Sequence, residues 1–113
     1  MIYLDDMYRH AIGNYRGMKM SHMIADDEDE LHEIARKIGM RRSWFQRDHY
    51  DIPIMRRDAA IALGAIPITY RQCGLMDAVR RQTGVLPPPD KAESIWKGLR
   101  GQKAKVTPEA QYA

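Results

Sequence analysis

The strongest hydrophobic pattern in the chain is a helical repeat between residues 26 and 39. Four apolar side chains recur there at intervals of three and four residues: Leu31, Ile34, Ala35 and Ile38. This spacing places them on one face of an α-helix. Asp27 suits the N-cap, Glu30 follows three residues later, and Gly39 supplies a left-handed stop. The pattern predicts a helix, and capping explains the acidic run at its start better than a metal site does.

Two shorter apolar segments precede this helix. Residues 2–5, with the sequence IYLD, predict a first strand that ends in acidic residues. Residues 18–25, MKMSHMIA, show partial alternation, which predicts a strand with His22 on one face and Met23 on the other. Between these strands, two glycines and an asparagine within residues 9–17 indicate a loop.

Strand and helix signals alternate over the next part of the chain. The segments SWFQ and HYDIPI, within residues 43–54, predict one or two strands, and Pro53 argues against a central position in the sheet. The apolar patterns that follow predict a helix over 55–64, a strand over 65–69 and a helix over 70–84. This alternation predicts an α/β fold, a single small domain with a short mixed or partly parallel sheet and about three helices.

The end of the chain differs in composition. Consecutive prolines within residues 85–90 favour an extended linker after a compact domain of residues 1–84. Residues 91–101 carry apolar side chains at helical spacing, and the residues after them show no periodicity. We therefore expect the segment 91–113 to form a short helix followed by a flexible basic tail.

Composition narrows the class of protein. The hydrophobic content is 44%, and no run approaches the roughly 20 apolar residues that a membrane span needs. The single cysteine, Cys73, excludes an intramolecular disulfide and a cysteine-rich zinc site, so we expect a cytoplasmic protein. The net charge is +3, with the basic excess in the second half of the chain. That distribution suits an anionic partner, and a basic surface that only keeps the protein soluble explains it equally well.

His49 and Asp51 are the pair with the clearest chemical potential. If residues 49–51 are extended, both side chains emerge on one face of the strand. The carboxylate then either orients the imidazole as a general base or joins it in binding a divalent metal ion. Asp5, at the end of the first strand, and His22, within the second, would complete a metal site with Asp51 if the strands bring them together. Their plainer interpretations are an acid at a turn and a hydrogen-bonded core histidine.

Arginine and aromatic residues surround this pair. Arg42, Arg56 and Arg57 are candidates for binding phosphate, because the guanidinium fork matches phosphate oxygens. Trp44 and Phe45 interleave with them, and aromatic faces stack on bases. This mixture is typical of a nucleotide or nucleic-acid surface. In the alternative, the aromatic residues fill the core and the arginines are solvated, and we expect at least one aromatic residue in the core.

Five blocks of the sequence resemble a family of small bacterial and phage proteins that is known only as a domain of unknown function. The blocks are YLDDM, MKMSHMIADDEDELHEIARKIGM, WFQ, HYDI and RRDAAIALGAIPI, which lie in this order between residues 2 and 70. The resemblance implies that their polar residues form a set, namely Asp5, Asp6, His22, Asp26, His32, Gln46, His49 and Asp51. Only Arg47 and Asp48 separate WFQ from HYDI, where the family has a longer connection. The family implies no activity.

These residues lead to one preferred function and two alternatives. We expect a protein that binds a phosphate-bearing ligand such as a nucleotide or nucleic acid and, in one version, hydrolyses it with a divalent metal ion. In that version Asp5 and Asp51 hold the ion and His49 is the base, while Arg42 or Arg56 neutralises the phosphate. The first alternative is a non-enzymatic accessory protein of phage or bacteria that binds a protein partner through its C-terminal tail. The second is that the polar set is a buried hydrogen-bond network.

Overall fold

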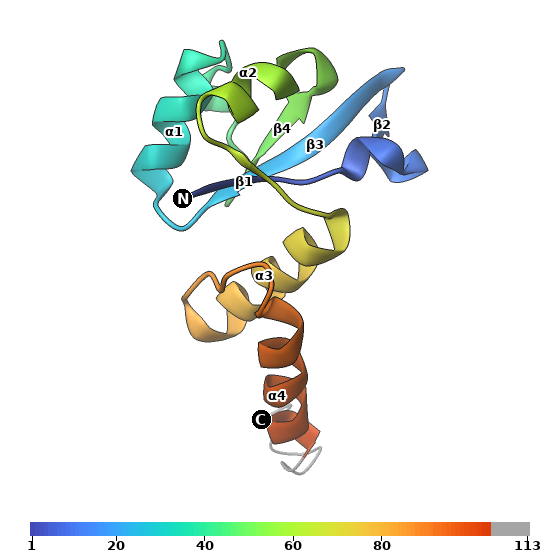
Figure 1. The fold of residues 1–113 in the computed structure, drawn as a ribbon, viewed down its shortest axis with the longest axis vertical. Coiled ribbons are helices and arrows are strands. Elements are labelled where there is room, and N and C mark those ends of the chain that lie inside the picture. The colour runs from blue at the N-terminus through green and yellow to red at the C-terminus, as the bar shows by residue number, and fades with distance from the viewer. Residues whose placement is uncertain (105–113) are drawn as a thin grey trace. The chain divides into compact units, whose positions relative to one another are not determined.

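The structure, a computed structural model, describes residues 1–104. These residues form a five-stranded sheet of mixed direction and four α-helices, joined by short turns and 3₁₀ helices (Figure 1). The predicted α/β class is therefore confirmed. The chain divides into two compact units, Met1–Cys73 and Gly74–Ala113.

The sheet belongs to the first unit and is organised around β3 (Met18–Ala25). Three strands pair with β3 in antiparallel fashion: β2 (Asn14–Tyr15) at its start, β4 (Tyr50–Pro53) along its middle and β1 (Ile2–Leu4) at its end. The short strand β5 (Ile66–Pro67) runs parallel to β1. The eight residues predicted as the second strand are therefore those of β3.

Strand β4 pairs with β3 alone and forms an edge of the sheet. Pro53 lies at its end, where a missing backbone N–H is tolerated, as the sequence predicts. The predicted loop over residues 9–17 contains β2, a two-residue strand that the sequence does not reveal. Apart from β2, the strand order follows from contacts between segments that are distant in the chain.

Helices α1 (Glu28–Lys37) and α2 (Arg57–Ala62) lie on one face of this sheet (Figure 1). The Asp27 side chain accepts a hydrogen bond from the backbone N–H of Glu30, and Gly39 has a φ of +85° after the end of α1. Both helix ends are therefore the predicted ones, because a cap at the start and a left-handed residue at the end satisfy backbone groups that the helix leaves open.

The core of the first unit lies between the sheet and these two helices. It is built from apolar side chains of β1, β3, β4, α1 and α2, among them Ile2, Leu4, Met23, Leu31, Ile34, Tyr50, Ile52 and Ala60. Alternation along β3 and β4 turns Met23, Tyr50 and Ile52 into this core. It turns His22 and Asp51 to the opposite face, where they are register partners across the two strands.

Of the one or two strands predicted over residues 43–54, one forms, as β4. Residues Arg42–Trp44 of the segment around SWFQ form a 3₁₀ helix, and Gln46 makes only an isolated bridge with His49. The backbone N–H of Trp44 bonds to the carbonyl of Arg41 at 3.0 Å, so local bonds replace a strand ladder. Trp44 is 46% exposed, whereas Phe45 packs against the core, which confirms the expectation of a core aromatic residue.

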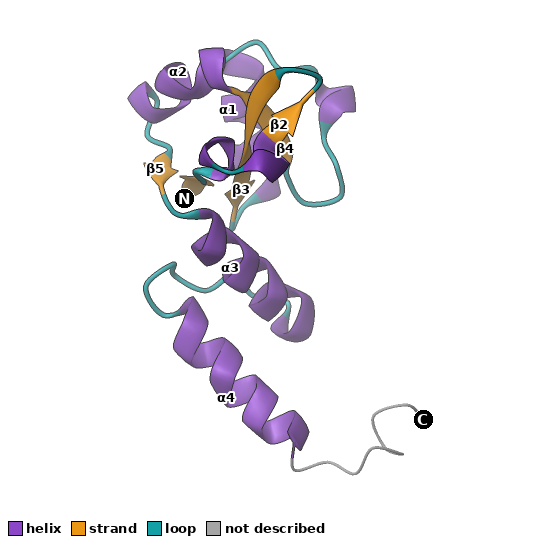
Figure 2. Cartoon of the chain, turned by 90° about the vertical axis from the view of Figure 1, so that its right-hand side faces the viewer, coloured by secondary structure: helices purple, strands orange, loops and turns teal. Residues whose placement is uncertain are grey.

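The second unit contains the part of α3 (Tyr70–Thr83) that follows Cys73, a proline-containing loop and α4 (Ala92–Ala104) (Figure 2). The helices expected over 70–84 and after the prolines are present. A boundary after residue 84 stays a prediction, and the predicted tail lies in residues 105–113, outside the described residues. In the part of the chain that the structure describes, no helix is long and apolar enough to cross a membrane.

Two isoleucines near the end of β4 offer a matched test of this fold. Ile52→Ala is expected to lower the free energy of unfolding by about 2–5 kcal/mol, because its side chain is fully buried. Ile54→Ala, at a side chain that is 40% exposed, is expected to cost about 1 kcal/mol or less. Urea unfolding followed by circular dichroism measures both. Equal losses would contradict the burial pattern of β4.

Candidate functional site

The candidate site begins with the pairing of β3 and β4. His22 on β3 and Asp51 on β4 are register partners, and both side chains lie on the face opposite to the core. The Nε2 atom of His22 is 3.8 Å from the Oδ1 atom of Asp51. The predicted meeting of these two residues is therefore a consequence of antiparallel register.

His49 joins this pair from the turn that precedes β4. Its Nε2 atom lies 3.4 Å from the same Oδ1 atom of Asp51. The rings of His22 and His49 meet edge to face, with centroids 4.9 Å apart. We call His22, His49 and Asp51 the His–Asp cluster. One nitrogen or oxygen atom from each of the three lies within 4.8 Å of the others, a spacing that could hold a metal ion.

Each imidazole of the His–Asp cluster has a carboxylate at its other nitrogen. The Nδ1 atom of His22 is 2.8 Å from the Asp5 carboxylate, and the Nδ1 atom of His49 is 2.8 Å from the Asp48 carboxylate. Because a carboxylate accepts hydrogen bonds, each Nδ1 carries the proton and donates it. These partners orient both rings and leave both Nε2 atoms with the lone pair that a metal ion or a proton takes.

The two oxygens of Asp51 have different surroundings. Oδ2 accepts a hydrogen bond of 2.8 Å from the side-chain amide of Gln46. Oδ1 is buried and accepts no hydrogen bond from any residue that the structure describes. A buried carboxylate oxygen without a partner is rare, because it loses hydration and gains nothing in return. This oxygen is also the one that both Nε2 atoms approach.

Asp5 anchors the site from within the fold. Its side chain is fully buried, and its Oδ1 atom accepts hydrogen bonds from the backbone N–H groups of His22 at 2.8 Å and Met7 at 3.0 Å. The guanidinium group of Arg57 donates to the backbone carbonyl of Asp5 and to Ser21 Oγ. A buried carboxylate needs several such partners, so Asp5 is held in one orientation.

The charges around His49 favour its protonated form. The Asp51 carboxylate beside Nε2 is the largest cause and Asp48 acts in the same direction, so that the pKa of His49 is raised from 6.5 to about 9 against the opposing effect of burial. In return, His49 lowers the pKa of the Asp51 carboxyl group. Without another cation, a proton on His49 therefore offsets part of the negative charge of the two carboxylates.

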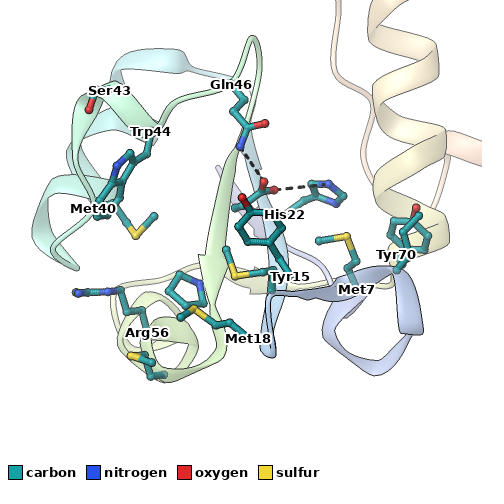
Figure 3. A pocket seen from close by; sticks show the side chains of 16 residues that line it. Met7, Tyr15, Met18, His22, Met40, Ser43, Trp44, Gln46, Arg56 and Tyr70 are labelled. Atoms are coloured by element: carbon teal, nitrogen blue, oxygen red, sulfur yellow. Dashed lines mark hydrogen bonds and ion pairs between the residues drawn. The ribbon is translucent and has the colours of Figure 1, made fainter.

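The His–Asp cluster borders a groove with a volume of about 1030 Å³ (Figure 3). His22, Asp51 and Gln46 line this groove. The dashed lines from Gln46 and His22 in Figure 3 mark their contacts with the carboxylate of Asp51. Much of the remaining lining is methionine: Met7, Met18, Met20, Met40 and Met55. The groove therefore combines a polar cluster with walls that suit an apolar or aromatic group.

Two exposed aromatic side chains of the groove each have an arginine stacked over the ring. Trp44 is 46% exposed, and the guanidinium carbon of Arg41 lies 5.5 Å from its ring centroid. Tyr15 is 61% exposed, and Arg16 lies 5.3 Å from its ring. Such pairs present a flat face and a positive charge together, which is a combination suited to bases and phosphates.

The predicted metal-binding and catalytic residues come together in the structure, although not in equal roles. His22, His49 and Asp51 form the cluster. Asp5 lies behind His22 with both carboxylate oxygens engaged by hydrogen bonds, so it is a support for the imidazole more than a free ligand. Whether these residues form a functional site stays a prediction.

The side chains of the three predicted phosphate-binding arginines contact different parts of the fold. Arg57 bonds to Asp5 and Ser21, as described above. Arg56 lines the groove while one of its nitrogens donates to the carbonyl of Ile38. Arg42 has a side chain that is 64% exposed, and its guanidinium stacks on the ring of Phe45. Arg56 is thus the one of the three that borders the groove.

Sequence reasoning missed Asp48 and Tyr15. Asp48 directly precedes His49. If both residues lay in a strand, their side chains would point to opposite faces, and Asp48 would then have no part in the site. In the structure both lie in the turn before β4, where their side chains meet. His32, which the resemblance places in the same polar set, bonds instead to Tyr50 and Glu28 beside α1.

The protonation of His49 predicts how stability depends on pH. In the presence of a chelator, the stabilisation from protonated His49 is fully present below pH 6.5 and lost as pH rises through about 9. The free energy of unfolding should fall over this interval by an amount on the order of 2 kcal/mol. Denaturant unfolding at a series of pH values measures it. His49→Gln should flatten the profile, and an unchanged slope in that variant would contradict the assignment.

Comparison with known proteins identifies a family and no closer relative. No curated protein and no solved structure matches the chain. One family model, described as "Protein of unknown function (DUF4031)", matches residues 2–81. This range includes the whole His–Asp cluster and its supporting carboxylates, and it ends before α4. The match confirms the resemblance to a domain of unknown function, and the chain belongs to the family of proteins of unknown function DUF4031.

Proposed function

We propose that the chain binds a phosphate-bearing ligand, a nucleotide or a nucleic-acid strand, in the groove and hydrolyses it at the His–Asp cluster. One observation carries this proposal: His22 and Asp51 line the same groove as two exposed aromatic rings that are paired with arginines. The groove therefore offers stacking surfaces, positive charge and a group that can accept a proton, side by side.

Binding would use the aromatic side of the groove. The exposed faces of Trp44 and Tyr15 suit the stacking of bases, which is tolerant of base identity. Arg41 and Arg16 stand beside these rings, and Arg56 borders the groove, so phosphate groups would meet positive charge there. Arg42 is exposed on the same 3₁₀ helix as Trp44 and can add to this charge.

Hydrolysis would take place where Asp51 faces the groove. A water oxygen attacks phosphorus while the bond from phosphorus to the leaving oxygen breaks. The proton of the water passes to Nε2 of His49 in its neutral form, 3.4 Å from Asp51 Oδ1, and the leaving oxygen takes a proton from solvent. A divalent ion, the help expected from the sequence, would polarise the same water.

A protein partner for the C-terminal segment stays a prediction. The residues expected to form the tail are not among those described, and the described helix α4 lies beyond the family match. Its Trp96 is partly buried.

The two tryptophans make ligand binding directly observable. In Trp96→Phe, Trp44 is the remaining fluorophore, and a short single-stranded oligonucleotide or a mononucleotide is expected to quench its fluorescence by stacking. Trp44→Phe is the matched control, in which Trp96 should report no quenching. The quenching should weaken as salt is raised, more steeply for the oligonucleotide. Equal quenching in the two variants, or none in either, would contradict binding in the groove.

Hydrolysis is tested with one charge-removing substitution at two places. Asp51→Asn is expected to lower the rate of product release from nucleotides and single-stranded oligonucleotides by about 100-fold or more. Asp29→Asn, at an exposed carboxylate in the first turn of α1, should leave the rate unchanged. Chromatography of the products and thermal melting are measured together. A wild type that releases no product from the panel contradicts hydrolysis, and melting that falls only in Asp51→Asn then points to a structural network.

A further inference from the structure

We propose that Nε2 of His22, Nε2 of His49 and Oδ1 of Asp51 together bind one divalent transition-metal ion. The role of this ion rests on the proposed function, since the ion would activate the water that attacks the phosphate. Its evidence is separate, because the geometry of the three atoms does not depend on what occupies the groove.

The first argument is the nature of the atoms that converge. Both Nδ1 atoms face carboxylates, so a cation that displaces the proton between His49 and Asp51 would meet the lone pairs of both Nε2 atoms. The atom that both approach, Asp51 Oδ1, is a buried carboxylate oxygen with no hydrogen bond from the described residues. Three electron-rich atoms repel one another unless a proton or a cation lies among them. A metal ion satisfies all three at once, whereas one proton satisfies at most two.

The second argument is distance. Bonds of about 2.0–2.2 Å from a metal ion to nitrogen and oxygen place neighbouring ligand atoms about 3.0–3.4 Å apart. His49 Nε2 is 3.4 Å and His22 Nε2 is 3.8 Å from Asp51 Oδ1. A shift of a few tenths of an ångström at His22 therefore brings both distances to Asp51 Oδ1 into the bonding range, and the ligand atoms of the three residues all lie within 4.8 Å of one another.

The third argument is the support behind each ligand. A metal-binding imidazole usually donates its other N–H to a carboxylate or carbonyl, and both histidines of the cluster do so, to Asp5 and Asp48. Gln46 likewise donates to the second oxygen of Asp51. By contrast, one ring nitrogen of His32 forms a hydrogen bond with the hydroxyl group of Tyr50 and the other with the carboxylate of Glu28. Neither nitrogen is left for a metal ion.

The ligand types indicate the class of ion. Two imidazoles and one carboxylate suit Zn²⁺, Mn²⁺, Fe²⁺ or Co²⁺, whereas Mg²⁺ and Ca²⁺ prefer all-oxygen sites. Three protein ligands leave a position open for water, and His22 and Asp51 line the groove on that side. In this arrangement His49 acts as a ligand, and the ion lowers the pKa of its own water, so no separate base is required.

A second group of residues could compete for the ion. Asp5, His22 and Cys73 also offer atoms within 4.8 Å of one another. Both oxygens of Asp5 already accept hydrogen bonds, and two of these three bonds come from backbone N–H groups. Those N–H groups would be left unsatisfied if the carboxylate turned to a metal ion. The cluster around Asp51 is therefore the preferred site.

Metal binding is measured on the full chain without any nucleotide. Protein treated with chelator and dialysed is titrated with Zn²⁺ by calorimetry and with Co²⁺ by visible absorption. We expect one ion per chain, with no displacement by excess Mg²⁺. His49→Gln and Asp51→Asn should weaken binding by at least about 100-fold, and Asp48→Asn, which removes only an orienting carboxylate, by about 10-fold to 100-fold. Melting of the metal-free variants shows that each remains folded.

Matched variants decide between the outcomes. Asp29→Asn and Cys73→Ser should bind as the wild type does. A wild type that binds no ion, or binding that survives both His49→Gln and Asp51→Asn, overturns the inference. A thiolate-to-cobalt absorption band that Cys73→Ser removes assigns the ion to the other group and overturns it too. Hydrolysis by a wild type that binds no ion in these titrations would overturn the metal site and leave the proposed function standing. Stoichiometric metal binding without turnover of any substrate would do the reverse.

Discussion

The candidate site depends on the hydrogen bonds of one buried carboxylate, that of Asp5. Asp5 is fully buried, and its two oxygens are met by the backbone N–H groups of Met7 and His22 and by the imidazole of His22. The same contacts fix the end of β1, the turn after it and the orientation of one ring. Removing any of these partners would leave a buried polar group unsatisfied, which is costly, so the three hydrogen bonds hold the Asp5 side chain in one orientation.

The two faces of β3 and β4 have different surroundings: one packs in the core and the other borders the groove. One face carries Met23, Tyr50 and Ile52 against α1 and α2, and it supplies the burial that stabilises the first unit. The other carries His22 and Asp51 toward the groove. Since side chains alternate along a strand, the polar pair occupies no position in the core. Its atoms are held more precisely on a sheet than they would be on a loop.

The turn before β4 brings the third member of the cluster into place. Two residues, Arg47 and Asp48, connect the bridged pair Gln46 and His49, and Arg47 adopts a left-handed conformation with a φ of 57°. This tight connection sets Asp48 beside the His49 ring and Gln46 beside Asp51. A single short turn therefore supplies His49 itself, the carboxylate that orients the His49 ring and the amide that orients Asp51.

The elements whose signals are local can be predicted from the amino-acid sequence. The helix after Asp27 and the strand at residues 18–25 appear where periodicity and capping place them, since both depend on neighbours within one turn or one strand. Three features of the site could not be predicted in this way: His22 stands opposite Asp51, Asp5 is buried, and Trp44 is exposed on a 3₁₀ helix. Register and burial arise from contacts between segments that are distant in the chain, and a shift of one residue would turn every side chain of β4 to the other face.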